Sequence, residues 1–181
     1  MDTIISRSGT LLIKAAIRNT TLTSDSDPKE LFVNTDYETV EVIVSDSRVA
    51  SRGSQFGHTA IIIDGREYGR APGGWDVDTK ERYLHRQQVS MQRDSWGYTL
   101  KVTAQEKQKI LAAINRRIAA NEPYSLFRNS CSSNIAEVLH EAGIQAHDPR
   151  WSFAEIVSPA DLMTGLRRSR RLVAEHVYPK K

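Results

Sequence analysis

The side chains best suited to chemistry are the only cysteine of the chain and one of its five histidines. Cys131 lies in residues 129–134 (NSCSSN), where Ser130 can cap the start of a helix. Cys131 then becomes the first helical residue, and the free amides and positive dipole end found there stabilise a thiolate. The sequence therefore predicts a nucleophilic cysteine. The alternative is a buried structural thiol, which is the usual role of a lone cysteine.

A thiolate nucleophile needs an imidazole within reach to exchange its proton. His140 lies on the same predicted helix as Cys131, more than two turns away, and so cannot reach it. Three other histidines fall in a polar stretch, a loop and the basic tail (His85, His147 and His176). His58 opens a β-rich run, where a sheet can hold its ring against a helix start, and we predict that His58 is the base.

Local signals predict the strands that position this pair. Runs over 57–63 and 66–70 flank Asp64-Gly65, which is the strongest two-residue signal for a β-hairpin. Alternating apolar residues predict further strands over 39–45 and 98–102. Residues 10–17 fit either a short helix or a strand, and loops or turns are predicted over 21–29, 51–55 and 71–75.

The second half of the chain is predicted to be mainly helical. A capping box at 103–106 opens a helix with one apolar stripe, which ends at 121–123. A second helix spans 130–143 and stops at a glycine. A third begins at 158–161, which supply a cap, a proline at the first helical position and an acid in the first turn. Strands followed by helices indicate an α+β fold.

The bulk composition indicates one globular domain with an ordinary core. The chain has 181 residues, 39% of them hydrophobic and 26% charged. We expect a single domain over residues 1–181, with residues 166–181 as a basic C-terminal extension. No apolar run approaches the ~20 residues that cross a bilayer, and no secretory signal is visible. One cysteine allows no internal disulfide, and neither a cofactor nor a metal ion is expected.

Basic residues concentrate late, in 167–171 (RRSRR) and 180–181, although the formal net charge is only +3. Such a cluster could bind an anionic membrane or phosphate groups. The alternative is that these arginines face solvent or pair with the protein's own acids. Nucleic-acid binding is not expected, because no reading module or aromatic stacking pattern accompanies the charge.

Two motifs in order resemble the permuted NlpC-type papain-like proteins, which include lecithin:retinol acyltransferase-like proteins and many bacterial effector and toxin domains. The motifs are 57–68 (GHTAIIIDGREY) and, much later, 124–126 (YSL) with 129–132 (NSCS). In this family the histidine strand precedes the cysteine helix. Residues 141–144 and 158–162 are similar to the family's continuation, so the resemblance covers about residues 55–165. It implies a permuted papain-like α+β fold with an antiparallel sheet packed against helices.

The resemblance also implies roles for the site residues. Cys131 attacks an amide or ester carbonyl, His58 shuttles the proton, and amides at the helix start bind the oxyanion. The family usually places a third polar residue on the strand after the histidine. A two-residue turn puts Ala71 opposite His58 here, and a register one residue tighter would bring in Arg70 and Tyr68. Glu67 is the only acid on that strand, but it lies near the turn, far along the strand from His58, so the third residue stays open among these three. A further departure is Ser130, which stands directly before the cysteine where many relatives carry asparagine.

Two functions follow from these observations. The first is a monomeric cysteine hydrolase or acyltransferase of amidase, peptidase or thioesterase type, with peptidoglycan peptides, proteins or lipids as the substrates that the resemblance implies. The second is a catalytically inactive papain-like scaffold that acts as a secreted bacterial effector by binding a host or partner protein. The arginine-rich end and the lack of a clear third polar residue favour the second. We expect synthesis in the bacterial cytoplasm and, for an effector or toxin, export without a cleavable signal peptide.

Overall fold

The structure, a computed structural model, describes residues 37–47, 57–125, 129–146 and 157–181, together with the backbone of three N-terminal strands. These strands, β1 (Thr3–Ile5), β2 (Leu11–Ala16) and β3 (Glu30–Asn34), form a small antiparallel sheet. Residues 11–16 are therefore a strand, which settles the choice between helix and strand for this segment. The loop predicted over 21–29, the turn predicted over 51–55 and His147 lie outside the described residues.

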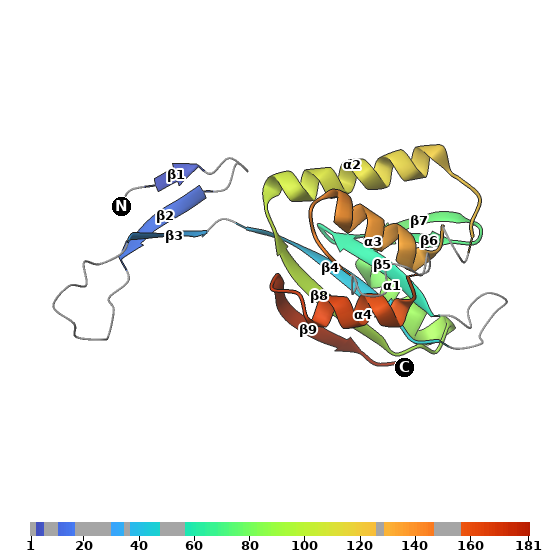
Figure 1. Cartoon of the computed structure of the whole chain (residues 1–181). Helices are drawn as coiled ribbons and strands as arrows, with labels where there is room; N and C mark the ends of the chain where they lie inside the picture. Colours follow the sequence, from blue (N-terminus) through green and yellow to red (C-terminus); the bar gives the residue numbers. More distant parts are fainter. Residues whose placement is uncertain are drawn as a thin grey trace.

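The main sheet has six antiparallel strands in the order β7-β6-β5-β4-β8-β9 (Figure 1). They are β4 (Glu38–Ser45), β5 (His58–Ile63), β6 (Arg66–Ala71), β7 (Gly74–Thr79), β8 (Ser95–Val102) and β9 (Leu172–Tyr178). The four strands predicted from alternation and from the Asp64-Gly65 turn are confirmed. Both turn residues have positive φ, 50° and 75°, as a tight hairpin of this kind requires.

Two strands differ from the sequence prediction. The loop predicted over 71–75 is only a two-residue turn, after which β7 begins at Gly74. The segment 166–181, predicted as a basic C-terminal extension, completes a helix and adds β9 to the edge of the main sheet, where Glu175 pairs with Tyr98. The assignment of the whole chain to a single domain stays a prediction.

The three predicted helices are confirmed, and each begins with a complete capping box. They are α2 (Ala104–Ala120), α3 (Cys131–Glu141) and α4 (Pro159–Arg167), capped by Thr103, Ser130 and Ser158. A fourth helix, α1 (Lys80–His85), continues into a short π-helix, η2 (Arg86–Ser90). The sequence did not predict α1 and η2, because their polar residues give no clear apolar stripe.

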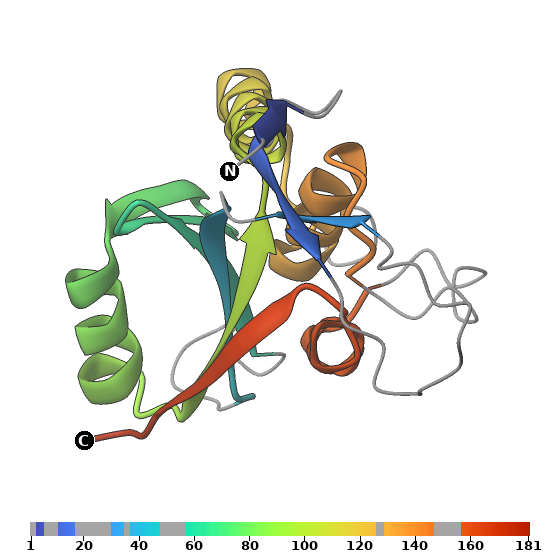
Figure 2. The ribbon, with the colours of Figure 1, turned by 90° about the vertical axis from the view of Figure 1, so that its left-hand side faces the viewer.

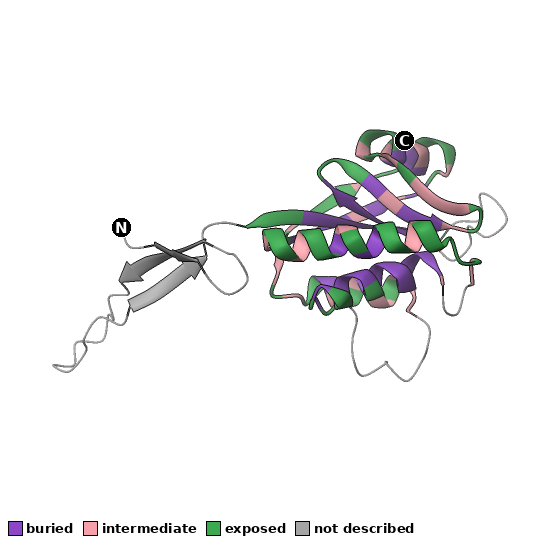
Figure 3. Ribbon diagram, turned by 90° about the horizontal axis from the view of Figure 1, so that it is seen from above, coloured by how far each residue is buried: buried purple, intermediate pink, exposed green. Residues whose placement is uncertain are grey.

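Helices cover both faces of the main sheet (Figure 2). α2, α3 and α4 lie on one side and enclose the larger core, which includes Ile61 and Ile63 of β5. α1 lies on the other side and encloses a smaller core, which includes Ala60 and Ile62. Exposed positions dominate the outward side of α2, while the strands beneath it are largely buried (Figure 3). Because side chains alternate along β5, His58 belongs to the face that α1 covers.

The described helices include none that combines the length and the apolar character needed to span a membrane.

Candidate active site

Cys131 is the first residue of α3, as predicted, and only 5% of it is exposed. Its helix start is fixed by Ser130, whose hydroxyl accepts a hydrogen bond from the backbone N–H of Ser133 at 3.2 Å. The sulfur receives hydrogen bonds from the backbone amides of Thr59, Cys131 and Ser132. These donors favour the thiolate, but burial outweighs them and raises the pKa of Cys131. The resting thiol is therefore protonated at neutral pH.

The backbone of β5 brings the histidine strand to the sulfur. Pairing between β5 and β6 runs from Ile63–Arg66 to Ala60–Gly69 and stops there. The next residue of β5 is Thr59, and its backbone N–H donates to the Cys131 sulfur instead of to β6. The start of α3 thus lies against the residue next to His58, although the two candidate catalytic residues are far apart in the sequence.

His58 is the first residue of β5 and is half-buried against α1. Its ring centroid lies 6.0 Å from that of Tyr83, which is fully buried on α1. Burial lowers the pKa of His58 to about 4, and the positive charges of Arg93 and Arg86 act in the same direction. The imidazole is therefore neutral at pH 7, and it is a weaker base than an ordinary histidine. The hydrogen bonds to the Cys131 sulfur come from backbone amides, including that of Thr59, rather than from the His58 ring.

Of the three candidates for the third residue, Glu67 lies beside His58. A β-carbon placed on Gly69 would stand 2.5 Å from Glu67 Oε1 and 3.2 Å from His58 Nε2, so both atoms border the space that this glycine leaves open. Glu67 is fully buried, and neither carboxyl oxygen has a hydrogen-bond partner among the described residues. Burial, reinforced by the negative charge of Asp76, raises the pKa of Glu67 to about 8.

The other two candidates turn to the opposite face of β6. Tyr68 packs against the larger core beneath α2, α3 and α4. Arg70 donates to the backbone carbonyls of Ala71 and Glu122, and its guanidinium lies 5.8 Å from the centre of the Tyr124 ring. The structure therefore brings Glu67, and neither Tyr68 nor Arg70, to the face that carries His58.

An ion-pair cluster that the sequence did not predict lies next to Glu67. Arg86, the first residue of η2, pairs with Asp76 and, at 3.6 Å, with Asp78. Both aspartates lie on β7 directly opposite Gly69 and Glu67. The sequence shows acids at positions 76 and 78, but it does not show that they lie beside Glu67. That becomes visible only from the pairing of β7 with β6. The described part of the chain contains no cluster of three His, Cys, Asp or Glu residues that could bind a metal ion.

The histidines rejected as bases lie elsewhere in the fold. His85 ends α1 rather than lying in an irregular stretch, His140 is exposed on α3, and His176 lies on β9. The basic cluster pairs in part with the protein's own acids. Arg171 makes two contacts of 2.8 Å with Glu106, and the Arg167 guanidinium lies 3.6 Å from Glu175.

A family model described as the Lnb N-terminal periplasmic domain matches residues 68–168, which is more than half of the chain. The chain belongs to the Lnb N-terminal periplasmic domain family. The matched Lnb region includes Cys131 and the whole of α2 and α3. It begins just after Glu67, so β5 with His58 lies outside the match. A search of the curated proteins found no match to this Lnb-family chain.

A solved structure similar to this Lnb-family chain is the crystal structure of a type VI secretion system effector, TseH. The two share a TM-score of 0.52 and 16% sequence identity, over 75% of this chain and 91% of the TseH chain. At this identity the likeness shows the fold. The predicted class, an α+β fold of permuted papain-like type with an antiparallel sheet packed against helices, is confirmed.

Proposed function

We propose that this Lnb-family chain is a cysteine hydrolase or acyltransferase, with Cys131 as nucleophile, His58 as general base and Glu67 as the residue that orients the imidazole. The observation that carries the proposal is the contact between the Thr59 amide and the Cys131 sulfur, which joins the histidine strand to the start of the cysteine helix. Glu67 supports it, because a carboxyl oxygen beside the ring can accept a hydrogen bond from one imidazole N–H and leave the other nitrogen free to take the thiol proton.

The reaction starts from a neutral thiol and a neutral imidazole. His58 takes the thiol proton as the Cys131 sulfur attacks the carbonyl carbon of an amide or ester. Backbone amides at the start of α3 stabilise the negative oxygen of the tetrahedral intermediate. The bond to the leaving group then breaks, and imidazolium returns its proton to the leaving nitrogen or oxygen. Water, or an acceptor hydroxyl or amine, releases the acyl group from the resulting thioester by the same steps.

The second candidate function is a catalytically inactive papain-like scaffold that binds a host or partner protein. The burial of Cys131, at 5% exposure, favours it, because a substrate carbonyl must reach the sulfur. The unpartnered oxygens of Glu67 favour it as well, since an orienting acid in a working site is normally hydrogen-bonded.

We further propose that the chain acts outside the cytoplasm as an exported effector. Two comparisons support this proposal: the matching family model is described as a periplasmic domain, and TseH is a type VI secretion system effector. The substrates proposed for the thiol are therefore those of the cell envelope, namely peptidoglycan peptides or lipid acyl groups, with proteins as a third class.

Acylation of Cys131 tests the first function. The protein is mixed with p-nitrophenyl acetate at neutral pH, and mass spectrometry locates the acetyl group. We expect acetyl-Cys131 with release of p-nitrophenol, and a rate reduced about 100-fold or more in His58→Ala, which is the usual contribution of a general base. His140→Ala is the matched control, because that histidine is exposed on the same helix as the thiol. Equal rates in the two histidine variants, or no adduct on Cys131, would favour the scaffold.

A further inference from the structure

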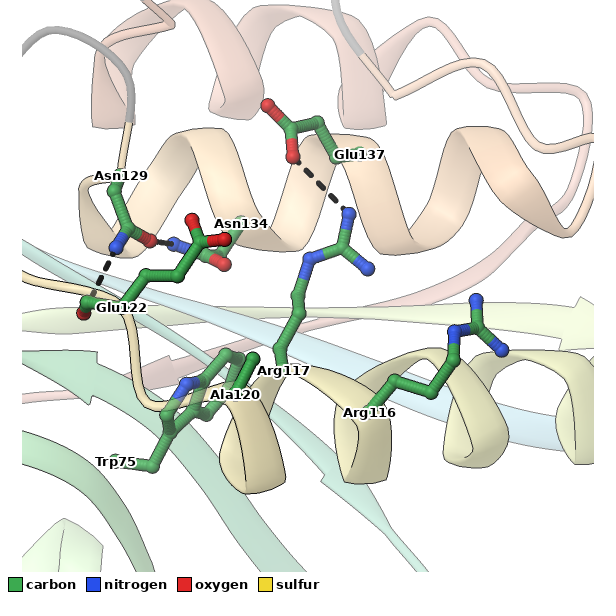
Figure 4. Close-up of a pocket in the computed structure, with 8 residues that line it drawn as sticks. All are labelled: Trp75, Arg116, Arg117, Ala120, Glu122, Asn129, Asn134 and Glu137. Carbon is green, nitrogen blue, oxygen red and sulfur yellow. Dashed lines mark hydrogen bonds and ion pairs between the residues drawn. The ribbon is translucent and has the colours of Figure 1, made fainter.

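A polar hollow of about 270 Å³ opens beside the first turn of α3 (Figure 4). β7, the end of α2 and the start of α3 supply its walls, and the residues that matter below are Trp75, Arg117, Glu122, Asn129, Asn134 and Glu137. Asn134 follows Cys131 by three residues and so neighbours it on the helix surface. The hollow therefore adjoins the helix turn that carries the proposed nucleophile.

The arginines in the walls of this hollow are paired with acids. Arg117, which crosses from α2 to α3 in Figure 4, lies 3.1 Å from Glu137 and 2.7 Å from Glu141. Glu141 also pairs with Arg116 at 2.5 Å. An anion would have to compete with the acids already paired with these arginines, so the hollow suits a ligand without a negative charge.

Several planar polar groups in the hollow are held in fixed positions with hydrogen-bonding capacity left over. The Asn134 amide nitrogen donates to Asn129 Oδ1 at 2.7 Å and to the backbone carbonyl of Ser130 at 2.8 Å, which fixes the side chain and leaves its own carbonyl oxygen for a ligand. Asn129 in turn donates to the backbone carbonyls of Glu122 and Pro123. Glu122 lines the same hollow, and its carboxylate pairs with none of the described cations.

Trp75 lines the hollow and also packs against the larger core, so its indole supplies an apolar wall. A flat aromatic wall beside the fixed Asn134 amide and the Glu122 carboxylate matches a ring that has an apolar face and hydroxyl groups at its edge. We propose that this hollow binds a neutral sugar residue. The proposal rests on the proposed function, because it identifies the substrate of Cys131 as an acyl or peptidyl group attached to a glycan.

The test uses full-length Cys131→Ser protein labelled with ¹⁵N, so that binding is measured without turnover. The probe is N-acetylated chitotriose, and the readout is the indole N–H signal of Trp75, assigned with Trp75→Phe. We expect a saturable shift of this signal, with affinity reduced at least tenfold in Glu122→Ala. Glu81→Ala is the matched control, because Glu81 is an exposed acid on α1, across the sheet from the hollow.

Three results would overturn the inference: no shift with chitotriose, an unchanged affinity in Glu122→Ala, or an equal shift with free lysine, which would indicate a site for cations. The outcome is separable from that of the proposed function. Sugar binding to Cys131→Ser together with no acylation of wild-type Cys131 would reject the thiol chemistry alone. Acylation without sugar binding would reject this inference alone.

Discussion

Replacing Glu67 by glutamine should stabilise the protein at neutral pH, even though it removes the acid proposed to orient His58. The folded carboxyl has a pKa of about 8, against 4.5 for an ordinary glutamate. At pH 7 the unfolded chain has lost a proton that the folded chain keeps. The interval between the ordinary glutamate pKa of 4.5 and pH 7 is about 2.5 pH units. At 1.36 kcal/mol for each unit, keeping this proton lowers the stability of the folded wild type by ~3 kcal/mol at pH 7. Glutamine fills the same volume and does not titrate.

The sign of the pH dependence follows from the same pKa. The stability contributed by neutral Glu67 is complete below pH 4.5 and is lost as the pH rises towards 8. His58 acts in the opposite direction, because its pKa of about 4 makes the fold lose stability as the pH falls below 6.5. The histidine is present in both proteins, so its contribution largely cancels when the wild type and Glu67→Gln are compared at each pH.

Urea denaturation at pH 4.5 and pH 7 provides the measurement. The two proteins should differ little at pH 4.5, and Glu67→Gln should be more stable by ~3 kcal/mol at pH 7. Glu81→Gln serves as the control for the loss of one exposed carboxylate. A stability difference between the wild type and Glu67→Gln that is the same at both pH values would show that Glu67 is not a buried neutral acid.

Three other predictions follow from the site. Gly69→Ala should destabilise the fold by ~1–3 kcal/mol and abolish acylation, because its β-carbon would stand 2.5 Å from Glu67 Oε1. Gly73→Ala is the control and should do neither, because a β-carbon there has no atom within 4 Å. Equal melting temperatures for the two variants would contradict this packing. Ser130→Ala should cost ~1 kcal/mol in thermal unfolding through loss of the helix cap. Alkylation of Cys131 by iodoacetamide should show a midpoint above the ordinary thiol value, and a midpoint below it would contradict the effect of burial.

Most elements of the fold were predictable because their signals are local. The Asp64-Gly65 turn sets the register of β5 and β6, and the predicted pairing of His58 with Ala71 agrees with the observed pairing of Ala60 with Gly69. The three capping boxes fix the starts of α2, α3 and α4 within single residues. β7 and β9 were missed, because each is an edge strand with exposed residues and pairs with a strand that the local sequence does not reveal.

The site could be predicted only in part. Cys131 and His58 were chosen from their places at a helix start and a strand start, and the structure places α3 against β5. Glu67 was considered too far along its strand from His58, since it pairs with Ile62. The missing factor is Gly69, whose lack of a side chain lets the long Glu67 side chain extend towards the ring. The raised pKa of Cys131 was not predictable either, because burial depends on how the whole fold packs around the helix start.

The position of β9 at the edge of the main sheet has a consequence for synthesis. β8 carries the buried residues Tyr98 and Leu100, and β9 is the strand that pairs with its outer edge. A ribosome makes β8 well before β9, with α2, α3 and α4 in between. Throughout that interval β8 presents unpaired backbone groups, which are a template for pairing with other chains. The nascent chain therefore stays at risk of aggregation until β9 emerges, and a truncation before residue 172 would make that risk permanent.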